Sequence, residues 1–332
     1  MSSLNVAVVG ATGLVGRKMV QVLEERRFPV AELRLLASAR SAGRSMKFNG
    51  KEYPVRKLEP GSFEGVKLAL FSAGASVSKE FAPAAVRSGA LVIDNSSAFR
   101  MEEGVPLVVP EVNPGEIAKH NGIIANPNCS TIQMVVPLKP LHDRWKIRRL
   151  VIATYQSVTG AGRRALSQLE SELAKEPNPE RKFPHAIAYN VMPQIDVFFE
   201  DGYSREERKM KDETRKILGD GSIRITATCV RVPVVGGHSE AVNIEFERPY
   251  DLDEVRGLLG QTPGVCLQDD VGQSVYPMPI WSHEKDEIFV GRLRRDESIP
   301  NGLNLWIVSD NLRKGAATNA VQIAEAWLKI QH

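Results

Sequence analysis

A glycine-rich turn close to the start of the chain constrains the fold more than any other feature. The apolar run Val6–Val9 is typical of a strand, and the segment Gly10-Ala-Thr-Gly13-Leu-Val-Gly16 follows it directly. Apolar residues then recur at the spacing of one helix face, at Val15, Met19, Val22 and Leu23. A strand, a tight glycine turn and a helix open a βαβ unit in which the backbone can approach a phosphate. The spacing G-x-x-G-x-x-G also fits a turn needed only for close helix–strand packing, but we expect dinucleotide binding.

The residues after the second predicted strand, Leu33–Ala37, indicate which dinucleotide binds. A site that prefers NAD usually places an acid here to hold the ribose 2′-hydroxyl. The segment Ser38-Ala-Arg40-Ser41-Ala-Gly43 contains no acid. The Arg40 guanidinium and the neighbouring hydroxyls suit a 2′-phosphate, which favours NADP, whereas a solvated loop arginine is the alternative reading.

Short apolar runs alternate with helical patterns over roughly the first 125 residues, which is typical of a parallel sheet. Further strands are predicted at Val66–Phe71, Leu91–Ile93, Leu107–Val109 and Ile123–Ala125, and a helix at Val77–Arg87. From about Arg148 the pattern indicates an α+β domain on a mixed or antiparallel sheet. Its predicted strands are Leu150–Gln156, Ile223–Val230, Ala241–Phe246, Ile288–Arg292 and Leu303–Ser309. Its predicted helices are Ala161–Lys175, Ser204–Leu218 and Asp251–Leu259, and an amphipathic helix follows at Ala316–Ile330.

Length and composition exclude several classes of protein. A chain of 332 residues suggests two domains, and 42% hydrophobic with 25% charged residues excludes a disordered chain. A net charge of +3 is too balanced for a dedicated nucleic-acid binder. No apolar run approaches the roughly 18 residues that span a bilayer, and Met1–Asn5 leaves no room for a signal peptide. Three cysteines favour a reduced cytoplasmic compartment over a disulfide framework or a metal site.

Cys129 is the cysteine whose surroundings suggest chemistry. It lies in Asn126-Pro-Asn128-Cys129-Ser-Thr131, between a predicted strand and the apolar run Ile132–Leu138. The start of a helix lowers the pKa of a thiol and offers N–H groups to an oxyanion, so a nucleophile is predicted here. A small buried hydrophobe is the alternative, which the polar neighbours disfavour. Cys229 and Cys266 lie in apolar runs and are expected in the core.

A thiolate nucleophile needs a base, and His238 has the most suggestive setting among the six histidines. It lies in Val235-Gly-Gly237-His238-Ser-Glu240, where paired glycines let the backbone bend sharply and direct an imidazole into a cleft. From these residues alone, a purely structural role for His238 is as well supported as a catalytic one.

Taken together, the motifs closely resemble the aspartate-β-semialdehyde dehydrogenase family over essentially the whole chain. The matching segments are GATGLVG, ARSAG, DNSSAFR, PEVN, NPNCST, YQSVTGAG, EERK, RVPV, GGHSE and DNLRKGAA. The resemblance implies an α/β protein with a Rossmann-like NADP-binding domain and a catalytic and dimerisation domain of the glyceraldehyde-phosphate-dehydrogenase type. It also implies reversible, NADPH-dependent conversion of L-4-aspartyl phosphate to L-aspartate-4-semialdehyde, on the route to lysine, diaminopimelate, methionine, threonine and isoleucine.

The resemblance assigns roles in the chemistry. Cys129 matches the nucleophile that forms a thioester, His238 the acid/base histidine, and Gln156 the glutamine that orients the substrate beside the thiol. Arg231 matches the guanidinium that binds the substrate α-carboxylate, and Glu206 the acid that receives the α-amino group. The residues that match the phosphate pocket are Arg100, Asn128 and Lys209. Without the resemblance, Glu206 and Lys209 would read as a solvated helix pair.

The resemblance also assigns the cofactor contacts and the partners. The residues that match the pyrophosphate turn are Gly10, Thr12, Gly13, Leu14 and Val15, and Arg40 and Ser41 match the adenosine-phosphate contacts. Positions near the nicotinamide are Ser157, Thr159, Gly160 and Asn311. Residues 1–127 would bind NADP, completed by the C-terminal helix at 313–332, and residues 128–312 would form the catalytic and dimerisation domain. A homodimer is implied, with small-molecule substrates and with no metal, nucleic acid or membrane.

Three other readings stay open. N-acetyl-γ-glutamyl-phosphate reductase has the same chemistry, but NPNCST, RVPV and the pair Glu206 and Lys209 argue against it. A catalytically silent nucleotide-binding paralogue would have lost its thiol or imidazole, and this chain retains both. A cofactor-free Cys–His hydrolase would leave the glycine turn and Arg40 unexplained.

Overall fold

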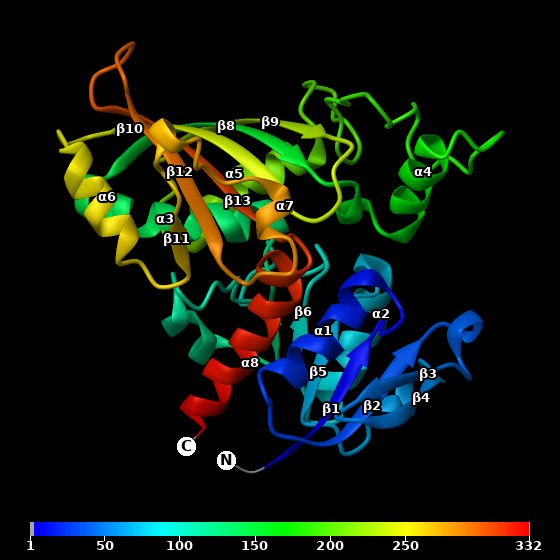
Figure 1. The fold of residues 1–332 in the computed structure, drawn as a ribbon. Helices are drawn as coiled ribbons and strands as arrows, with labels where there is room; N and C mark the ends of the chain where they lie inside the picture. Colours follow the sequence, from blue (N-terminus) through cyan, green and yellow to red (C-terminus); the bar gives the residue numbers. More distant parts are fainter. Residues whose placement is uncertain (1–2, 332) are drawn as a thin grey trace. The chain divides into compact units, whose positions relative to one another are not determined.

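The chain forms two compact units, each with its own sheet (Figure 1). The computed structural model describes residues 3–331, so Met1, Ser2 and His332 of the predicted domain ranges lie outside the described residues. Unit 1 comprises Met1–Asn128 and Ala316–His332, and unit 2 comprises Cys129–Gly315. The predicted α/β fold class is confirmed. Between residues 3 and 331, no helix combines the length and the apolar character needed to cross a bilayer.

The sheet of unit 1 has the strand order of a dinucleotide-binding fold. Its order is β3-β4-β2-β1-β5-β6-β7, and all neighbours pair in parallel except β3 and β4. The order reverses between β1 and β5, so the loop after β1 lies at the switch point where such sheets bind ligands. The strands are β1 (Leu4–Val9), β2 (Val30–Ala37), β3 (Ser45–Phe48), β4 (Lys51–Lys57), β5 (Leu68–Phe71), β6 (Leu91–Asp94) and β7 (Ile123–Ala125).

Helices cover both faces of this sheet. The α-helices are α1 (Leu14–Glu25), α2 (Ala75–Arg87) and α8 (Thr318–Ile330), with 3-10 turns η1 (Ala39–Ser41), η2 (Pro60–Phe63) and η3 (Pro114–Lys119). Val6 and Val8 point into one core with α1 and α8, whereas Ala7 and Val9 point into another with α2. Successive strand residues face opposite sides, so the continuous apolar run of β1 reflects burial on both.

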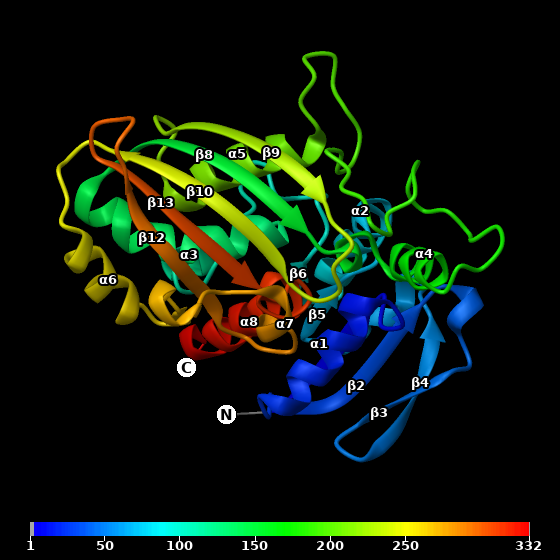
Figure 2. The ribbon, with the colours of Figure 1, turned by 45° about the horizontal axis from the view of Figure 1, so that its top comes forward.

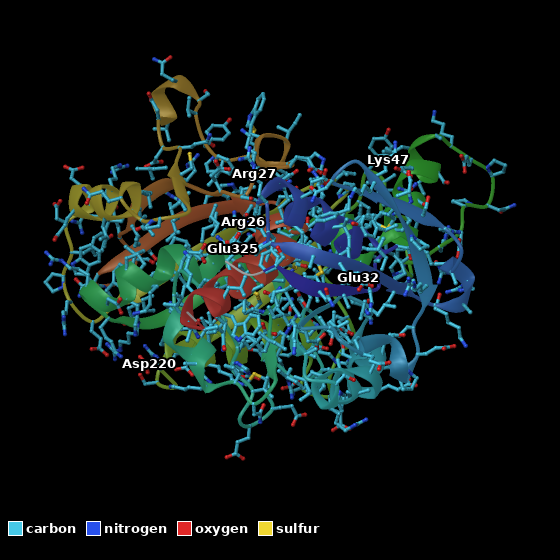
Figure 3. The ribbon with its side chains drawn as sticks, turned by 90° about the horizontal axis from the view of Figure 1, so that it is seen from below. Arg26, Arg27, Glu32, Lys47, Asp220 and Glu325 are labelled. Atoms are coloured by element: carbon cyan, nitrogen blue, oxygen red, sulfur yellow. The ribbon has the colours of Figure 1, made fainter. Side chains whose placement is uncertain are left out.

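The C-terminal helix α8 is an integral part of the unit 1 core. Its buried Ala320, Ile323 and Leu328 join the same apolar cluster as residues of β1 and α1. On the surface, Arg26 of α1 and Glu325 of α8 form a two-pronged ion pair at 2.7 and 2.8 Å (Figure 3). Helix α8 thus belongs to the nucleotide-binding half of the chain although it is the last element in sequence.

Unit 2 is built on a six-stranded mixed sheet, as predicted, in the order β11-β12-β13-β10-β8-β9. β8 pairs in parallel with β9, and β11 with β12, and the other pairs are antiparallel. The strands are β8 (Ile147–Gln156), β9 (Arg224–Arg231), β10 (His238–Phe246), β11 (Val265–Leu267), β12 (Ile288–Asp296) and β13 (Gly302–Ser309). The helices are α3 (Cys129–Trp145), α4 (Arg163–Leu173), α5 (Arg205–Leu218), α6 (Leu252–Gly260) and α7 (Pro279–Ser282). Shorter turns are η4 (Val158–Ala161), η5 (Val271–Gln273) and the π-helix η6 (Arg313–Ala317).

The two faces of this sheet differ. Helices α3 and α5 lie against one face (Figure 2). On that face the side chains of β10, and those of β8 from Leu150 onward, are buried, whereas the alternate residues on the other face, apart from the buried Ser239, are half-buried or exposed. The exposed members include the aromatic ring of Tyr155, which packs on Trp306 with ring centroids 5.5 Å apart.

Some predicted elements differ from the structure. Leu107–Val109 was predicted as a strand but forms only one bridge, from Leu107 to Ala125. Pro106 and Pro110 flank this segment and lack the N–H groups that a longer ladder would need. The β3–β4 hairpin was missed, although Asn49 and Gly50, both with positive φ, form the two-residue turn that favours one.

We expect Ile323→Ala in α8 to lower the free energy of unfolding of the whole chain by about 2–5 kcal/mol, because it leaves a cavity in the unit 1 core. Urea denaturation measures this loss. The exposed Lys329→Ala on the same helix is the control and should change stability by less than about 0.5 kcal/mol. Equal effects of the two changes would contradict the placement of α8 in this core.

Candidate active site

The thiol of Cys129 lies at the start of a helix, as the sequence predicts. Cys129 is the first residue of α3 and is half-buried, whereas Cys229 is fully buried and burial raises the pKa of its thiol. None of the three cysteines, all of which lie within the described residues, is part of a disulfide. A Cβ on Gly315 would lie only 3.0 Å from the Cys129 Cβ, so the backbone there closely approaches Cys129.

Three of the predicted site residues come from neighbouring strands of the unit 2 sheet. The register pairs Gln156 at the end of β8 with Arg231 at the end of β9. β10 pairs Ser239 with Tyr155, so His238 continues the same row beside Gln156. All three side chains are buried. The sheet therefore brings Arg231, Gln156 and His238 together in one row, which the sequence alone did not show.

The ring of His238 is held from one side and left open on the other. The Ser157 N–H donates to Nδ1 at 3.0 Å, so the neutral ring carries its proton on Nε2. Nε2 is buried and has no hydrogen-bond partner in the protein. Burial, and then the Arg231 cation, lower the pKa of His238 to about 3. The ring is therefore neutral at physiological pH and presents an unsatisfied Nε2–H.

Arg231 lies beside the imidazole and is only partly satisfied. Its Nη1 donates to the Ser157 carbonyl at 2.6 Å, while its Nε has no partner. A Cβ on Gly160 would lie 3.0 Å from Nη1 of Arg231 and 3.1 Å from Nε2 of His238. Gly160 is exposed, so its missing side chain leaves room in front of both groups. Two buried groups that border the same space, and that each keep one donor without a partner, are typical of a ligand site.

Glu206 and Lys209 form a pair on one face of α5. Lys209 Nζ donates to Glu206 Oε2 at 3.2 Å, and Gln156 Nε2 donates to Glu206 Oε1 at 3.1 Å. Lys209 also contacts Asp196 at 3.2 Å. Glu206 is buried rather than solvated, so the general expectation for charges on a helix surface is wrong here. The helix is started by a capping box between Ser204 and Glu207.

The residues predicted near the nicotinamide form one hydrogen-bonded cluster. The Ser157 and Thr159 hydroxyls lie 2.8 Å apart, and Thr159 Oγ1 donates to Asn311 Oδ1 at 3.1 Å. The same Asn311 oxygen accepts the Gly237 N–H at 3.2 Å. Gly236 and Gly237 both have positive φ, which confirms the predicted sharp bend before His238.

Unit 1 carries the predicted nucleotide turn. Gly10 has φ +81°, and a Cβ there would lie 3.0 Å from the backbone after β5. A Cβ on Gly16 would lie 2.1 Å from the Gly10 carbonyl oxygen, so only glycine fits. Leu14 and Val15 begin α1 directly after this turn. The Thr12 and Ser41 hydroxyls are 3.3 Å apart, and Arg40, which precedes Ser41 in the chain, is exposed. Hydroxyls and a cationic residue therefore follow the carboxyl ends of β1 and β2. This chemistry fits a phosphorylated dinucleotide.

Two predicted phosphate ligands also belong to unit 1. Arg100 is buried, and its guanidinium donates to the carbonyls of Asn126 and Asn95 at 3.0 and 2.8 Å. Asn128 is buried and directly precedes Cys129 in the chain. These contacts fix Arg100 to the loop that precedes Cys129.

Sequence reasoning gave no role to Gln133 or Glu240, which are both buried in unit 2. Gln133 Nε2 donates to the His238 carbonyl at 3.2 Å. Glu240 is the last residue of the segment GGHSE, and the period of two along a strand puts it on the same face as His238. That period was the signal that could have singled it out.

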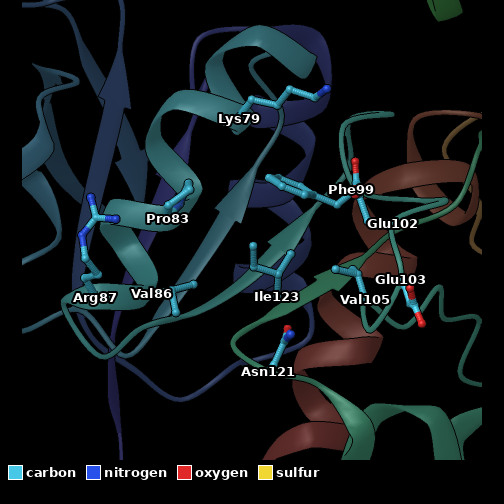
Figure 4. Close-up of a pocket in the computed structure, with 10 residues that line it drawn as sticks. All are labelled: Lys79, Pro83, Val86, Arg87, Phe99, Glu102, Glu103, Val105, Asn121 and Ile123. Atoms are coloured by element: carbon cyan, nitrogen blue, oxygen red, sulfur yellow. The ribbon is translucent and has the colours of Figure 1, made fainter.

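Other features of the described residues lie apart from these groups. A surface pocket of about 610 Å³ in unit 1 has both Lys79 and Glu102 in its lining and contains none of the predicted site residues (Figure 4). His283, Glu284 and Asp310 come close enough to share a metal ion. The Asp310 carboxylate, however, already accepts N–H groups of Glu284, Leu312 and Arg313.

Comparison with known proteins gives a consistent picture. The family model "Semialdehyde dehydrogenase, NAD binding domain" matches residues 5–120, and "Semialdehyde dehydrogenase, dimerisation domain" matches residues 138–314. The chain is 55% identical to the aspartate-semialdehyde dehydrogenase of Aquifex aeolicus over 98% of both chains. The crystal structure of aspartate semialdehyde dehydrogenase II complexed with ASA from Vibrio cholerae superposes with a TM-score of 0.96, at 48% identity and 99% coverage of both chains. The Candida albicans enzyme with NADP has a TM-score of 0.78, at 26% identity and 99% coverage of both chains.

We expect the neutral, buried His238 to make stability depend on pH. The unfolded chain protonates this group near its ordinary pKa of 6.5 but the folded chain only near 3, so acid favours unfolding between these values. The free energy of unfolding should fall by about 1.4 kcal/mol per pH unit below 6.5 from this group alone. Urea denaturation of the wild type and of His238→Asn, at about pH 7 and about pH 5, isolates the contribution. Identical pH dependence in the two proteins would contradict it.

Proposed function

The chain belongs to the aspartate-semialdehyde dehydrogenase family, and we propose that Cys129 is the nucleophile of its reaction. The protein is an NADP-dependent oxidoreductase that interconverts L-4-aspartyl phosphate and L-aspartate-4-semialdehyde. This reaction serves the biosynthesis of lysine, diaminopimelate, methionine, threonine and isoleucine. The observation that carries the residue assignments is that the Arg231 guanidinium and the His238 imidazole both border the space in front of Gly160, and that each keeps one buried donor without a partner.

In the first step, the Cys129 thiolate attacks the carbonyl carbon of the acyl phosphate. The new carbon–sulfur bond forms, the bond to the phosphate oxygen breaks, and inorganic phosphate leaves with the electron pair. A thioester remains on Cys129. The carbonyl oxygen that becomes the oxyanion of the addition lies near the start of α3, where the positive end of the helix dipole stabilises it.

In the second step, the thioester is reduced to a tetrahedral adduct. When bound, NADPH supplies the hydride for this step. The Nε2–H of the neutral His238 faces the open space and donates a hydrogen bond to the oxyanion of the adduct, which stabilises the negative charge. In the reverse direction the same N–H stabilises the oxyanion that forms when the thiolate adds to the aldehyde. Collapse of the adduct expels the thiolate and releases the aldehyde.

The charged residues around the thiol recognise the two ends of the substrate. Arg231 offers its planar guanidinium, of which Nε has no partner in the protein, to the α-carboxylate. Glu206 receives the α-amino group, and Gln156, which already donates to Glu206, orients the substrate beside Cys129. The phosphate group is bound by Arg100, Asn128 and Lys209.

NADP binding divides between two sets of residues. In unit 1, the glycine turn and its helix bind the pyrophosphate, and Arg40 and Ser41 bind the 2′-phosphate. In unit 2, the nicotinamide contacts are Ser157, Thr159, Gly160 and Asn311. We keep the predicted domain boundaries at residues 127/128 and 312/313. The domain before the first boundary binds most of the cofactor, and the domain after it performs the chemistry.

The protein acts as a homodimer through the open face of the unit 2 sheet. The family model that covers most of unit 2 is named for dimerisation. Tyr155, Trp306 and Tyr276 offer partly exposed aromatic rings on or beside this face, next to a groove of about 410 Å³. Burial of such rings is what stabilises homodimers. The location is the cytoplasm, where the thiol of Cys129 stays reduced.

We expect wild-type protein to form NADPH from L-aspartate-4-semialdehyde and NADP only when inorganic phosphate is present, as measured by absorbance. Cys129→Ala should lower this rate by at least about a thousandfold while NADP still binds, because no thioester can form. NAD, and N-acetyl-glutamate-γ-semialdehyde as substrate, serve as controls for cofactor and substrate. Normal turnover in Cys129→Ala would contradict the nucleophile assignment.

We expect sedimentation equilibrium to give twice the chain mass for the wild type. Trp306→Glu places a charge on the open sheet face and should weaken dimerisation at least tenfold, by roughly the 2 kcal/mol of an interface hot spot. Ile330→Glu, at an exposed apolar position of α8, is the matched control and should leave the mass unchanged. A monomeric wild type, or a fully dimeric Trp306→Glu protein, would contradict the proposed surface.

A further inference from the structure

Glu240 is a buried carboxyl that the proposed chemistry does not use. It follows His238 by two residues in β10, so both side chains leave the same face of the strand. The register pairs Glu240 with Thr154 of β8 and with Ile307 of β13, and Thr154 with Cys229 of β9. Glu240 therefore lies in the row directly beneath the row that carries His238, and it is fully buried.

The first turn of α3 faces this carboxyl, with Ser130 and Gln133 as its polar neighbours. Gln133 Nε2 donates to the His238 carbonyl at 3.2 Å, which leaves Gln133 Oε1 buried without a donor. Both oxygens of Glu240 are also buried without a hydrogen-bond partner. An ionised carboxylate only accepts hydrogen bonds, so it cannot satisfy Oε1, whereas a protonated carboxyl supplies one O–H donor. A proton on Glu240 thus gives both Gln133 Oε1 and the Glu240 carboxyl a hydrogen-bond partner.

The charges around Glu240 also favour the neutral form. Within residues 3–331, Glu240 makes no ion pair. Burial, and then the Glu206 carboxylate on α5, raise the pKa of Glu240 well above its usual range, against the opposing effects of Ser130 and Gln133. The other titratable groups nearby are the buried thiol of Cys229 on β9 and the neutral ring of His238 on the same strand. An isolated negative charge in this place would be strongly disfavoured.

We propose that Glu240 is a positioning residue that works as a neutral carboxylic acid and donates its O–H to Gln133 Oε1. Gln133 in turn donates a hydrogen bond from Nε2 to the His238 carbonyl. The bridge ties the first turn of α3, which begins with Cys129, to the strand that begins with His238. It fixes the two elements that carry the nucleophile and the imidazole without placing a second charge beside them.

This inference rests on the proposed function for its kinetic readout. Glu240→Gln keeps a donor of the same shape, so kcat should stay within about threefold of the wild type. Glu240→Leu keeps the volume but loses the donor, so kcat should fall at least about tenfold, with the KM values for semialdehyde and NADP changed less than about twofold. Val242→Ala, on the same face of β10, is the matched control that lowers the melting temperature without lowering kcat.

A labelling experiment tests the charge on Glu240 without the substrate. The rate at which iodoacetamide alkylates Cys129, followed by mass spectrometry across pH, reports the thiol titration. Glu240→Gln should give the same titration curve as the wild type. If Glu240 were ionised, loss of its negative charge would shift the curve to lower pH, which would overturn the proposal. Infrared spectra should also show a protonated carboxyl band that Glu240→Gln lacks.

The bridge can also be broken from the helix. Gln133→Leu should lower kcat as much as Glu240→Leu does, and the double variant should lose no more than either alone, because all three remove one connection. Additive losses in the double variant, or a full kcat in Glu240→Leu, would overturn the proposal. The comparison of these three variants still decides the question if Glu240→Gln fails to fold. A wild type inactive on the semialdehyde would instead refute the proposed function, while the labelling curves would still judge Glu240.

Discussion

The register of four adjacent strands in unit 2 is the constraint on which the candidate site depends. β9, β8, β10 and β13 are paired so that Arg231, Gln156 and His238 share one row on the helix-covered face, with Glu240 in the row beneath. Strand side chains alternate with a period of two, so a slip of one residue would turn a strand's site residue to the opposite face. The apolar residues deeper in these strands, such as Val242 and Ile244, fix the register because they must face α3 and α5. Hydrophobic burial therefore positions the polar chemistry.

Within this frame, hydrogen bonds decide which polar atoms remain reactive. The Ser157 N–H donates to Nδ1 of His238, and the Ser157 carbonyl accepts from Arg231, so one residue orients both groups. The atoms left over, Nε2 of His238 and Nε of Arg231, are buried without a partner. An unsatisfied buried donor carries a free-energy cost of about 1–3 kcal/mol, which a ligand that accepts both would relieve. Under the proposed assignment of these residues, relief of this cost would contribute to the affinity for an anionic substrate.

The sequence predicted those parts that depend on local chemistry. The glycine turn after β1, the thiol at the start of α3 and the bend before His238 all follow from backbone rules that act over a few residues. The long-range parts could not be predicted without the resemblance. The burial of Glu206 depends on α5 packing against β9, and the row beside Gln156 depends on strand pairing. The Leu107–Val109 error has a local cause, since the flanking prolines allow only one bridge.

The empty place at Gly160 also limits how such a site can evolve. Any other residue there would bring its Cβ to 3.0 Å from Arg231 and 3.1 Å from His238, in the space that a substrate would occupy. Mutation at this position can therefore only take volume away, and it would disturb both groups together. A descendant of this protein that accepts a larger or differently charged aldehyde would have to change side chains on α5 or β9 instead. Gly160 would therefore stay unchanged while residues elsewhere in the site alter the specificity.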